Sequence, residues 1–381
     1  METVPDGPAW RNTVTTPTYR ILRMGAIGDA VGWPIEFARG PFDKTPPARL
    51  GLGEVTDDTQ MTLFAAEGIV DAVERVALDG GDLTSLTPGA ISDFHAAIVH
   101  HARASFLEWH ATQRPVARPT FAIPPTRLID RPALHKSRAP GGTCMSALEV
   151  TAKTGKTQAT NDSKGCGAVM RAAPYALVAR TTPEAYALAA SSGRITHGHV
   201  EGYGSAGVFA ALLFELLHGQ PLPDAVAAAT GYALKQIAPP TLTVSLAVSA
   251  LSPRSRELWA GWVGEEAVAT AIACAMDYHR EIVAAGLEFE ARPFNPEDVD
   301  PEAQADAIVR IGSVARAAIW RAAAHPGDSD STASMAAQLI GAMGCEPAWL
   351  GAWQGDVELE PVIAEMAGKL EAAYQRRVEV A

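Results

Sequence analysis

The sequence predicts an all-α protein built around one large domain, and three observations support this fold class. Alanine-rich stretches with apolar residues at every third or fourth position run through most of the 381 residues, a period typical of helices with one buried face. Alternating runs of Val, Ile and Thr, which are typical of strands, are nearly absent. No internal repeat of about 20 to 50 residues suggests a solenoid. Hydrophobic residues make up 48% of the chain, enough for a sizeable core.

The expected helices follow one another along almost the whole chain. Residues 1–17 are rich in Pro, Thr and Gly without apolar periodicity, so we expect a flexible leader there. The first helix is expected from Tyr19 to Ala30, with Pro34 halting the apolar run. Thr56 is a natural N-cap for the second helix. Further helices are expected around residues 91–109, 144–153, 183–192, 200–218, 223–236, 264–286, 302–324, 332–343 and 358–375.

Two segments interrupt the helical pattern. Residues 111–142 contain six prolines and a cluster of basic side chains with a single acid, Asp130. This basic insertion is either a solvated loop or a segment that covers a cleft and contacts phosphate or an acidic protein. Residues 293–300 are acidic and most simply form a connector. Neither segment has the character of a domain boundary, so residues 18–381 are expected to form one domain.

The charge and cysteine content exclude several classes of protein. A formal net charge of −12 disfavours nucleic-acid binding, which draws on clustered Lys and Arg. The sequence shows no uninterrupted apolar run of about 18 residues, so no membrane span is expected. The four cysteines have no CxxC spacing and no accompanying histidines at zinc-finger spacing. We therefore expect a reduced, cytoplasmic protein.

Two acidic clusters are the most informative feature of the chain. Thr56-Asp57-Asp58-Thr59 and Asp328-Ser329-Asp330-Ser331 lie about 270 residues apart, each at an expected helix start. Taken alone, each is explained by helix capping and by favourable interaction with the helix dipole. If the fold brings them together, their oxygen atoms suit two hard cations such as Mg²⁺ and an activated water. The pair therefore predicts a metal-dependent hydrolase.

Glycines and histidines mark further candidate sites. Gly25, Gly28 and Gly32 place small residues on one helix face and favour close helix packing. Gly165-Cys166-Gly167 is either an ordinary turn or a loop whose backbone approaches a ligand, with Cys166 as a wall residue. His197 is interpreted as a ligand contact or a supporting residue, and His199 as structural. Two histidines without a third ligand make a zinc site a poor interpretation.

Arginine and aromatic residues have more than one interpretation. Arg171 either meets a phosphate or ties the motifs together through an ion pair. Trp33, Phe37 and Trp353 are candidates for stacking on adenine, although packing in the core is the better interpretation for each.

Six motifs follow one another along the chain: Gly28-Asp29-Ala30 with Glu36, Thr56 to Met61, Gly165 to Arg171, Thr196-His197, Gly261 to Ala267, and Gly327 to Ala333. In this order they resemble the motifs of the ADP-ribosylglycohydrolases. This family of ADP-ribosyl-acceptor hydrolases includes dinitrogenase-reductase-activating glycohydrolase. The resemblance spans nearly the whole chain. It implies a compact helical bundle whose cleft holds two Mg²⁺ ions, or Mn²⁺, and hydrolysis of the bond between C1″ of ADP-ribose and an acceptor.

The resemblance also implies roles for individual residues. Glu36 would reach the metal centre either as a ligand or as the group that manages a proton, and it joins Asp57, Asp58 and Asp330 as catalytic. Ser331 stands where many relatives have Thr, and Thr332 is an alternative ligand. The implied metal ligands are Thr56, Asp57, Asp58, Asp328, Asp330 and Ser331, and the implied ADP-ribose contacts are Gly165, Cys166, Gly167 and His197.

The acceptor and the partners stay open at this point. The substrate would be an ADP-ribosylated protein or a small ADP-ribose conjugate, with arginine favoured over serine and O-acetyl linkages. One alternative is an immunity-type protein that occludes an ADP-ribosyltransferase toxin through the leader. The others are a catalytically silent relative, against which the intact aspartates argue, and a metal phosphoesterase.

Overall fold

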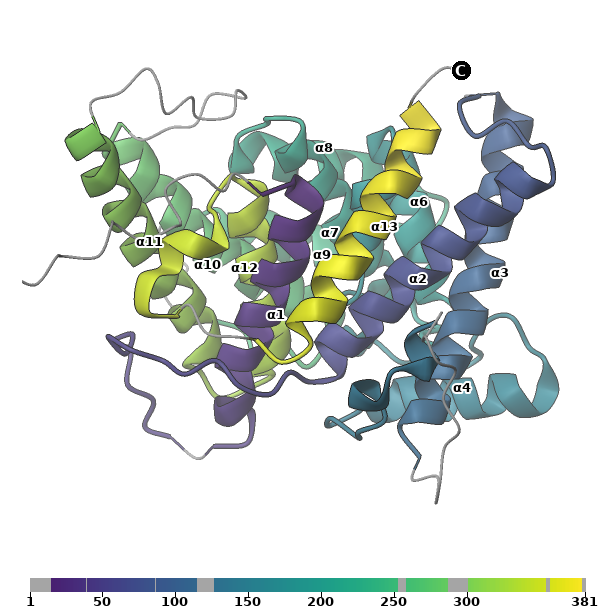
Figure 1. Cartoon of the computed structure of the whole chain (residues 1–381), viewed down its shortest axis with the longest axis horizontal. Coiled ribbons are helices and arrows are strands. Elements are labelled where there is room, and N and C mark those ends of the chain that lie inside the picture. Colours follow the sequence, from purple (N-terminus) through teal and green to yellow (C-terminus); the bar gives the residue numbers. More distant parts are fainter. Residues whose placement is uncertain are drawn as a thin grey trace, which may run out of the picture.

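The computed structural model describes residues 15–38, 40–85, 87–114, 127–252, 258–286, 301–353 and 357–378. These residues form thirteen α-helices, and within them the extended pairing is limited to one bridge between Gly165 and Val263 (Figure 1). The predicted all-α class is therefore confirmed. The helices are α1 (Pro17–Glu36), α2 (Asp57–Leu78), α3 (Pro88–Thr112), α4 (Gly142–Thr154), α5 (Ala173–Val178), α6 (Thr182–Gly193), α7 (Val200–Leu217), α8 (Leu222–Ala233), α9 (Thr241–Ala250), α10 (Gly264–Ala284), α11 (Pro301–Ala323), α12 (Ser329–Ala342) and α13 (Glu360–Val378).

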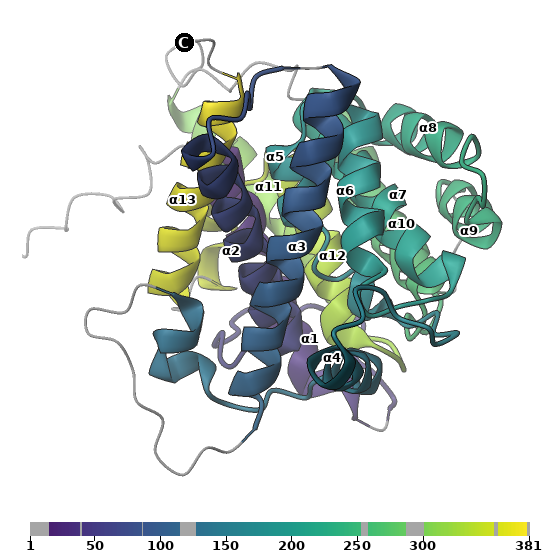
Figure 2. The same cartoon turned by 90° about the vertical axis from the view of Figure 1, so that its right-hand side faces the viewer.

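Helices α1 and α12 come from opposite ends of the chain and pack tightly against each other (Figures 1 and 2). A Cβ atom at Gly28 would lie 2.2 Å from the carbonyl oxygen of Ala333, and one at Gly32 would lie 2.2 Å from that of Ser329. The predicted glycine face therefore lets two backbones approach. Helix α13 lies beside α1 and α2, and α3 packs on the other side of α2 (Figure 2).

Some helix boundaries differ from the sequence prediction. Helix α1 continues to Glu36 with Pro34 inside it, so Pro34 does not halt it. A proline so close to the end removes one helical hydrogen bond and leaves the earlier turns intact. Helix α12 begins at Ser329 rather than Thr332. Helices α5 and α9 were not predicted, because they span only 6 and 10 residues without a clear amphipathic period. The leader was predicted over residues 1–17, but Thr16 caps α1 and Pro17 is its first residue. Residues 1–14 and the predicted connector at residues 293–300 lie outside the described residues.

Helix α7 is long and apolar enough to cross a membrane by length and mean hydropathy, and the sequence analysis did not expect such a helix. Within this fold, 78% of the stretch is buried. A core helix of a soluble protein passes the same test, and α7 packs against α6, α8 and α10. Its composition is thus explained by burial among other helices.

The basic insertion is held by acids of its own chain. Arg127 forms ion pairs with Glu67, Asp71 and Glu108, which lie on α2 and α3. Arg138 is buried and forms a two-point ion pair with Glu358. Arg131 and Lys136 also pair with glutamates. In the described part of the insertion, these charges bind the segment to the domain. Residues 115–126 lie outside the described residues.

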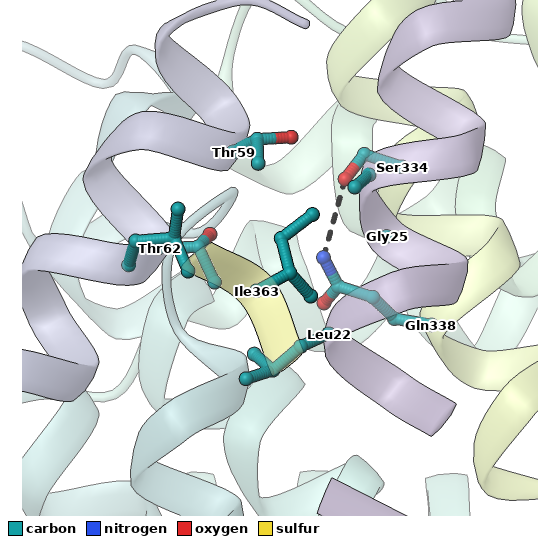
Figure 3. Close-up of a pocket in the computed structure, with 9 residues that line it drawn as sticks. Leu22, Gly25, Thr59, Thr62, Ser334, Gln338 and Ile363 are labelled. Carbon is teal, nitrogen blue, oxygen red and sulfur yellow. Dashed lines mark hydrogen bonds between the residues drawn. The ribbon is translucent and has the colours of Figure 1, made fainter. Parts of the chain in front are cut away.

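A small cavity lies between α1, α2 and α12, close to α13 (Figure 3). Its volume is about 10 Å³, which is room for one water molecule. The side-chain amide of Gln338 donates to the Ser334 hydroxyl at 3.2 Å, and the amide oxygen of Gln338 is buried without a partner. This cavity suits a structural water and is too small for a substrate.

Candidate metal and substrate site

The structure brings the two acidic clusters together. The Ser331 hydroxyl, in the first turn of α12, lies 2.9 and 3.0 Å from the carboxylate oxygens of Asp58, in the first turn of α2. Thr56 caps α2, with its hydroxyl accepting the Asp58 N–H at 3.2 Å. Helix starts thus orient oxygen-bearing side chains from both ends of the chain toward one centre.

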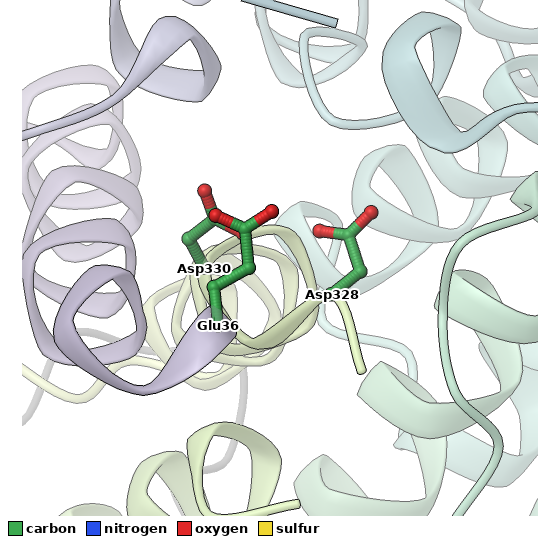
Figure 4. Close-up of side chains that lie close together, drawn as sticks. All are labelled: Glu36, Asp328 and Asp330. Carbon is green, nitrogen blue, oxygen red and sulfur yellow. The ribbon is translucent and has the colours of Figure 1, made fainter. Parts of the chain in front are cut away.

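Three further carboxylates complete the centre. Oxygen atoms of Glu36, Asp328 and Asp330 all lie within 4.8 Å of one another. Figure 4 shows Glu36 at the end of α1 and the two aspartates at the start of α12, with their carboxyl groups directed to the same side. Asp57, which is buried, accepts the Gly141 N–H at 3.1 Å.

The electrostatics of this cluster disfavour full ionisation of its acids. Burial and the neighbouring carboxylates raise the pKa of Glu36 to about 8. Burial is also the main cause that raises the pKa of Asp57 to about 8. The pKa values of Asp58 and Asp330 lie well above the ordinary range for the same reasons. Among the described residues, no Lys or Arg forms an ion pair with these acids, so protons or bound cations must balance their charge.

The donor set fits a hard divalent cation. It consists of carboxylate and hydroxyl oxygens, which Mg²⁺ and Mn²⁺ prefer, and it lacks the soft or imidazole ligands of a typical zinc centre. One carboxylate oxygen of Glu36 is buried without a hydrogen-bond partner, as expected for an atom that faces a cation or water. Thr332 does not fit this set, because its hydroxyl lies 2.7 and 2.6 Å from the carbonyls of Ala322 and Asp328, to which it donates.

The loop Gly165-Cys166-Gly167 borders the same centre. The Cys166 N–H donates to the Trp262 carbonyl at 3.2 Å, and Cys166 Sγ donates to an Asp328 carboxylate oxygen at 2.8 Å. Burial, followed by the negative charge of Asp328, raises the pKa of the Cys166 thiol well above its usual range. A thiol with a raised pKa is a poor nucleophile. Cys166 therefore lies against the acidic cluster as a wall residue and not as an activated thiolate.

The side chain of His197 packs against this loop. It is fully buried, its Nδ1 lies 2.8 Å from the Thr196 hydroxyl, and its Nε2 is buried without a partner. Burial and then Arg171 lower the pKa of His197 to about 3, so the ring is neutral. A Cβ atom at Gly165 or Gly167 would approach the ring to 3.3 Å. The glycines let the loop pass close to His197.

The hydrogen bonds of Arg171 and His199 decide between the roles considered for them in the sequence analysis. Arg171 is buried, and its guanidinium donates to the Gly167 carbonyl at 2.8 Å and to the Thr196 hydroxyl at 2.7 Å. It ties the loop to the His197 segment through these neutral groups, not through an ion pair. His199 has a structural role, because its ring accepts the Glu201 N–H at the start of α7.

Asp29 is a supporting residue that the sequence analysis did not assign. It is fully buried beneath the start of α2 and accepts the N–H groups of Thr56 at 3.0 Å and Thr59 at 3.1 Å. It therefore fixes the turn that carries Asp57 and Asp58. Burial is the main cause that raises its pKa to about 6. The position of Asp29 in the Gly28-Asp29-Ala30 motif was the sequence feature that could have indicated this supporting role.

The end of the basic insertion also contacts the turn that begins α2. The Arg138 carbonyl accepts the Asp57 N–H at 2.9 Å, while Gly141 donates to the Asp57 carboxylate. The Arg138 guanidinium donates to the Val55 carbonyl at 3.1 Å. These contacts involve backbone groups, so no residue pattern indicated them.

An all-helical fold whose converging helix starts gather buried carboxylates and a hydroxyl defines a protein with a site suited to hard divalent cations. Comparison with family models gives the match ADP-ribosylglycohydrolase over residues 21–379. The chain therefore belongs to the ADP-ribosylglycohydrolase family and is a hydrolase of ADP-ribosyl glycosidic bonds. The resemblance seen in the sequence is confirmed.

Solved structures show the same fold. An "ADP-ribosylglycohydrolase-related protein complex" matches with a TM-score of 0.56 and 22% identity, covering 95% of this chain and 98% of that one. Curated protein sequences yield no significant match.

Proposed function

We propose that this protein removes ADP-ribose from modified arginine side chains of proteins, using two Mg²⁺ or Mn²⁺ ions. The observation that carries the proposal is the contact between Ser331 and Asp58, because it joins two distant oxygen clusters in one centre. Thr56, Asp57, Asp58, Asp328, Asp330 and Ser331 would hold the ions, with Glu36 beside them. Arginine is chosen because arginine-directed hydrolysis is widespread among the family's members.

Bound divalent cations would polarise the substrate and lower the pKa of a water molecule. The reaction then forms a bond between the water oxygen and C1″ while the bond from C1″ to the guanidinium nitrogen breaks. The electron pair leaves with that nitrogen, which gains a proton, and the water loses one. Glu36 is suited to exchange a proton with the water or the departing nitrogen, because one of its carboxylate oxygens is buried without a partner. Carboxyl groups transfer protons in this way in glycosidases.

The loop around Cys166 and His197 would bind the ADP-ribose portion. Gly165 and Gly167 expose backbone close to the acidic centre, and the neutral His197 holds an unpartnered ring nitrogen. An acidic protein requires such local recognition of an anionic ligand. The cytoplasmic location expected from the sequence stays a prediction.

The test incubates the purified protein and Mg²⁺ with arginine-, serine- and O-acetyl-linked ADP-ribose and quantifies free ADP-ribose. We expect release from the arginine conjugate and a loss of about 100-fold or more in Asp58→Asn and Asp330→Asn, since weakening even outer-shell metal contacts costs 10- to 100-fold. Asp82→Asn is the matched control, because Asp82 bonds only to its own turn and is exposed. No release from any conjugate by metal-loaded protein would contradict the proposal.

Occlusion of an ADP-ribosyltransferase predicts a different result. That alternative depends on the leader, and residues 1–14 lie outside the described residues. Removal of residues 1–14 should leave hydrolysis unchanged. If it abolishes protection against a transferase while Asp58→Asn does not, occlusion is the function.

A further inference from the structure

Three aromatic side chains form a surface beside the acidic centre, which we name the aromatic platform: Trp33, Phe37 and Trp262. The ring centroids of Trp33 and Phe37 lie 6.2 Å apart and edge to face, and those of Phe37 and Trp262 lie 6.3 Å apart with a tilt of 31°. These spacings are in the range of favourable aromatic pairs. The platform joins the end of α1 to the segment that precedes α10.

Both ends of the platform are fixed next to the reacting groups. Phe37 directly follows Glu36 and caps α1. Trp262 directly follows Gly261, where a Cβ atom would lie 3.4 Å from Cβ of Asp328. The Trp262 carbonyl also accepts the N–H of Cys166, whose sulfur contacts Asp328. The backbone that carries Phe37 thus adjoins Glu36, and the backbone that carries Trp262 adjoins Asp328 and the Cys166 loop.

Core packing does not explain the platform. Phe37 is 69% exposed and Trp262 is 46% exposed, so most of the apolar surface of Phe37 faces solvent. Trp353, the third aromatic candidate from the sequence, is by contrast fully buried and donates from its indole N–H to the Pro47 carbonyl at 2.9 Å. The prediction of core packing is confirmed for Trp353 and wrong for Phe37.

The electrostatics of the platform suit a planar cation. Aromatic faces attract guanidinium groups, most strongly Trp. Within the described residues, the arginines that lie over aromatic rings cover Phe106, Tyr203 and Phe94, so none of the described arginines lies over a platform ring. The chain has a net charge of −12, which favours a cationic ligand over an anionic one.

We propose that the aromatic platform binds the guanidinium of the arginine acceptor and so selects the arginine linkage. This inference rests on the proposed function and adds the residues that set its specificity. The acceptor is bonded to C1″, the atom that must lie at the acidic centre. Adenine is separated from C1″ by two phosphates and a second ribose, so a surface one residue away from Glu36 is placed for the acceptor.

The experiment compares two substrates that share the whole ADP-ribose portion, ADP-ribosyl-arginine and ADP-ribosyl-serine, and determines kcat and KM for each. Phe37→Leu and Trp262→Leu keep an apolar side chain and remove the ring. Phe37→Tyr and Trp262→Phe keep a ring. Ile237→Ala is the control, since Ile237 is a fully exposed apolar residue on the loop between α8 and α9.

For the arginine conjugate, we expect each leucine variant to raise KM about 3- to 30-fold, the range of cation–π contacts, with kcat little changed. The ring-keeping variants should recover most of the affinity. KM for the serine conjugate, Mn²⁺ affinity and the melting temperature should stay at wild-type values. If the rings had only a structural role, the leucine variants would change KM for both conjugates and would also lower the melting temperature.

Three results would overturn the inference. Equal KM increases for both conjugates would show that the platform binds the shared portion, such as adenine. Wild-type kinetics in the leucine variants would show that the platform binds nothing in this reaction. If the wild-type protein cleaves the serine conjugate and not the arginine conjugate, the proposed arginine function fails, and the guanidinium assignment fails with it.

Discussion

The Ser331 hydroxyl donates a hydrogen bond to the Asp58 carboxylate across 273 residues of sequence. Both residues lie in the first turn of a helix, α12 for Ser331 and α2 for Asp58. Free backbone N–H groups at helix starts favour negatively charged side chains there. Two such starts facing each other make it possible for the chain to keep buried acids close together without a paired Lys or Arg.

Removing this hydroxyl should weaken the metal centre. We expect Ser331→Ala to lower Mn²⁺ affinity about 10- to 100-fold, the usual cost of losing a group that orients a metal ligand. Ser331→Thr should retain most of the affinity because it keeps the hydroxyl. Calorimetric Mn²⁺ titration tests this, with the exposed Ser146→Ala as control. Unchanged affinity in Ser331→Ala would exclude Ser331 from the site.

The metal-free protein should lose stability as pH rises from about 4 to about 8. Glu36 and Asp57 have folded-state pKa values of about 8, above their ordinary values of 4.5 and 3.8. A raised folded pKa means that the unfolded chain loses its protons first, so the associated stability is complete below about pH 4 and is lost through pH 8.

Divalent cations should reverse this loss. At 100 times its Kd, a ligand adds about 2.7 kcal/mol to the free energy of unfolding. The increase should grow as the pH rises toward and above about 8, because the acids then give up the protons that compete with the cation. Melting curves in EDTA and in Mg²⁺ across this pH range measure both effects. A melting temperature of the metal-free protein that is constant across this range, or that Mg²⁺ leaves unchanged, would contradict the arrangement.

Asp29 should position the metal ligands without contacting the metal. In Asp29→Asn, the side-chain amide can no longer accept all the N–H groups that Thr56 and Thr59 present, so a buried donor loses its partner. We expect a loss of about 1 to 3 kcal/mol in the free energy of unfolding, together with weaker Mn²⁺ binding. Urea unfolding and Mn²⁺ titration measure the two effects. A loss of Mn²⁺ affinity without any loss of stability would instead indicate direct ligation.

The main features of the centre could be predicted from the sequence because buried acids are rare. Asp57 next to Asp58, and Asp328 two residues before Asp330, are each explained by helix capping when taken alone, and their combination is what indicated a cation. Their helix-start positions were also visible, because Thr56 and the small residues around Ser331 are typical of such turns. Short-range patterns therefore indicated the oxygen ligands.

Other parts depended on tertiary structure. The Arg138 carbonyl and the Gly141 N–H hold Asp57 through backbone atoms, which every residue type carries. The exposure of Phe37 also could not be predicted, because an aromatic residue after an apolar helix is usually in the core. Whether a ring faces the core or a ligand is decided by the neighbouring helices.

The approach of α1 to α12 should be the most sensitive packing contact near the site. In Gly32→Ala, the new Cβ would lie 2.2 Å from the Ser329 carbonyl oxygen and 2.5 Å from Cα of Asp330. Both contacts are with backbone, so α1 must move and shift Glu36 away from the aspartates of α12. We expect a loss of about 1 to 3 kcal/mol in stability and a clear fall in activity.

Gly368→Ala in α13 is the matched control for this change. It is also a glycine-to-alanine substitution within a helix, but nothing lies within 4 Å of its new Cβ. We expect a gain of about 0.5 to 1 kcal/mol from helix propensity and unchanged activity. Chemical unfolding and the ADP-ribose release assay measure both variants. If Gly32→Ala is as stable and as active as Gly368→Ala, the close approach of α1 to α12 does not set the geometry of the centre.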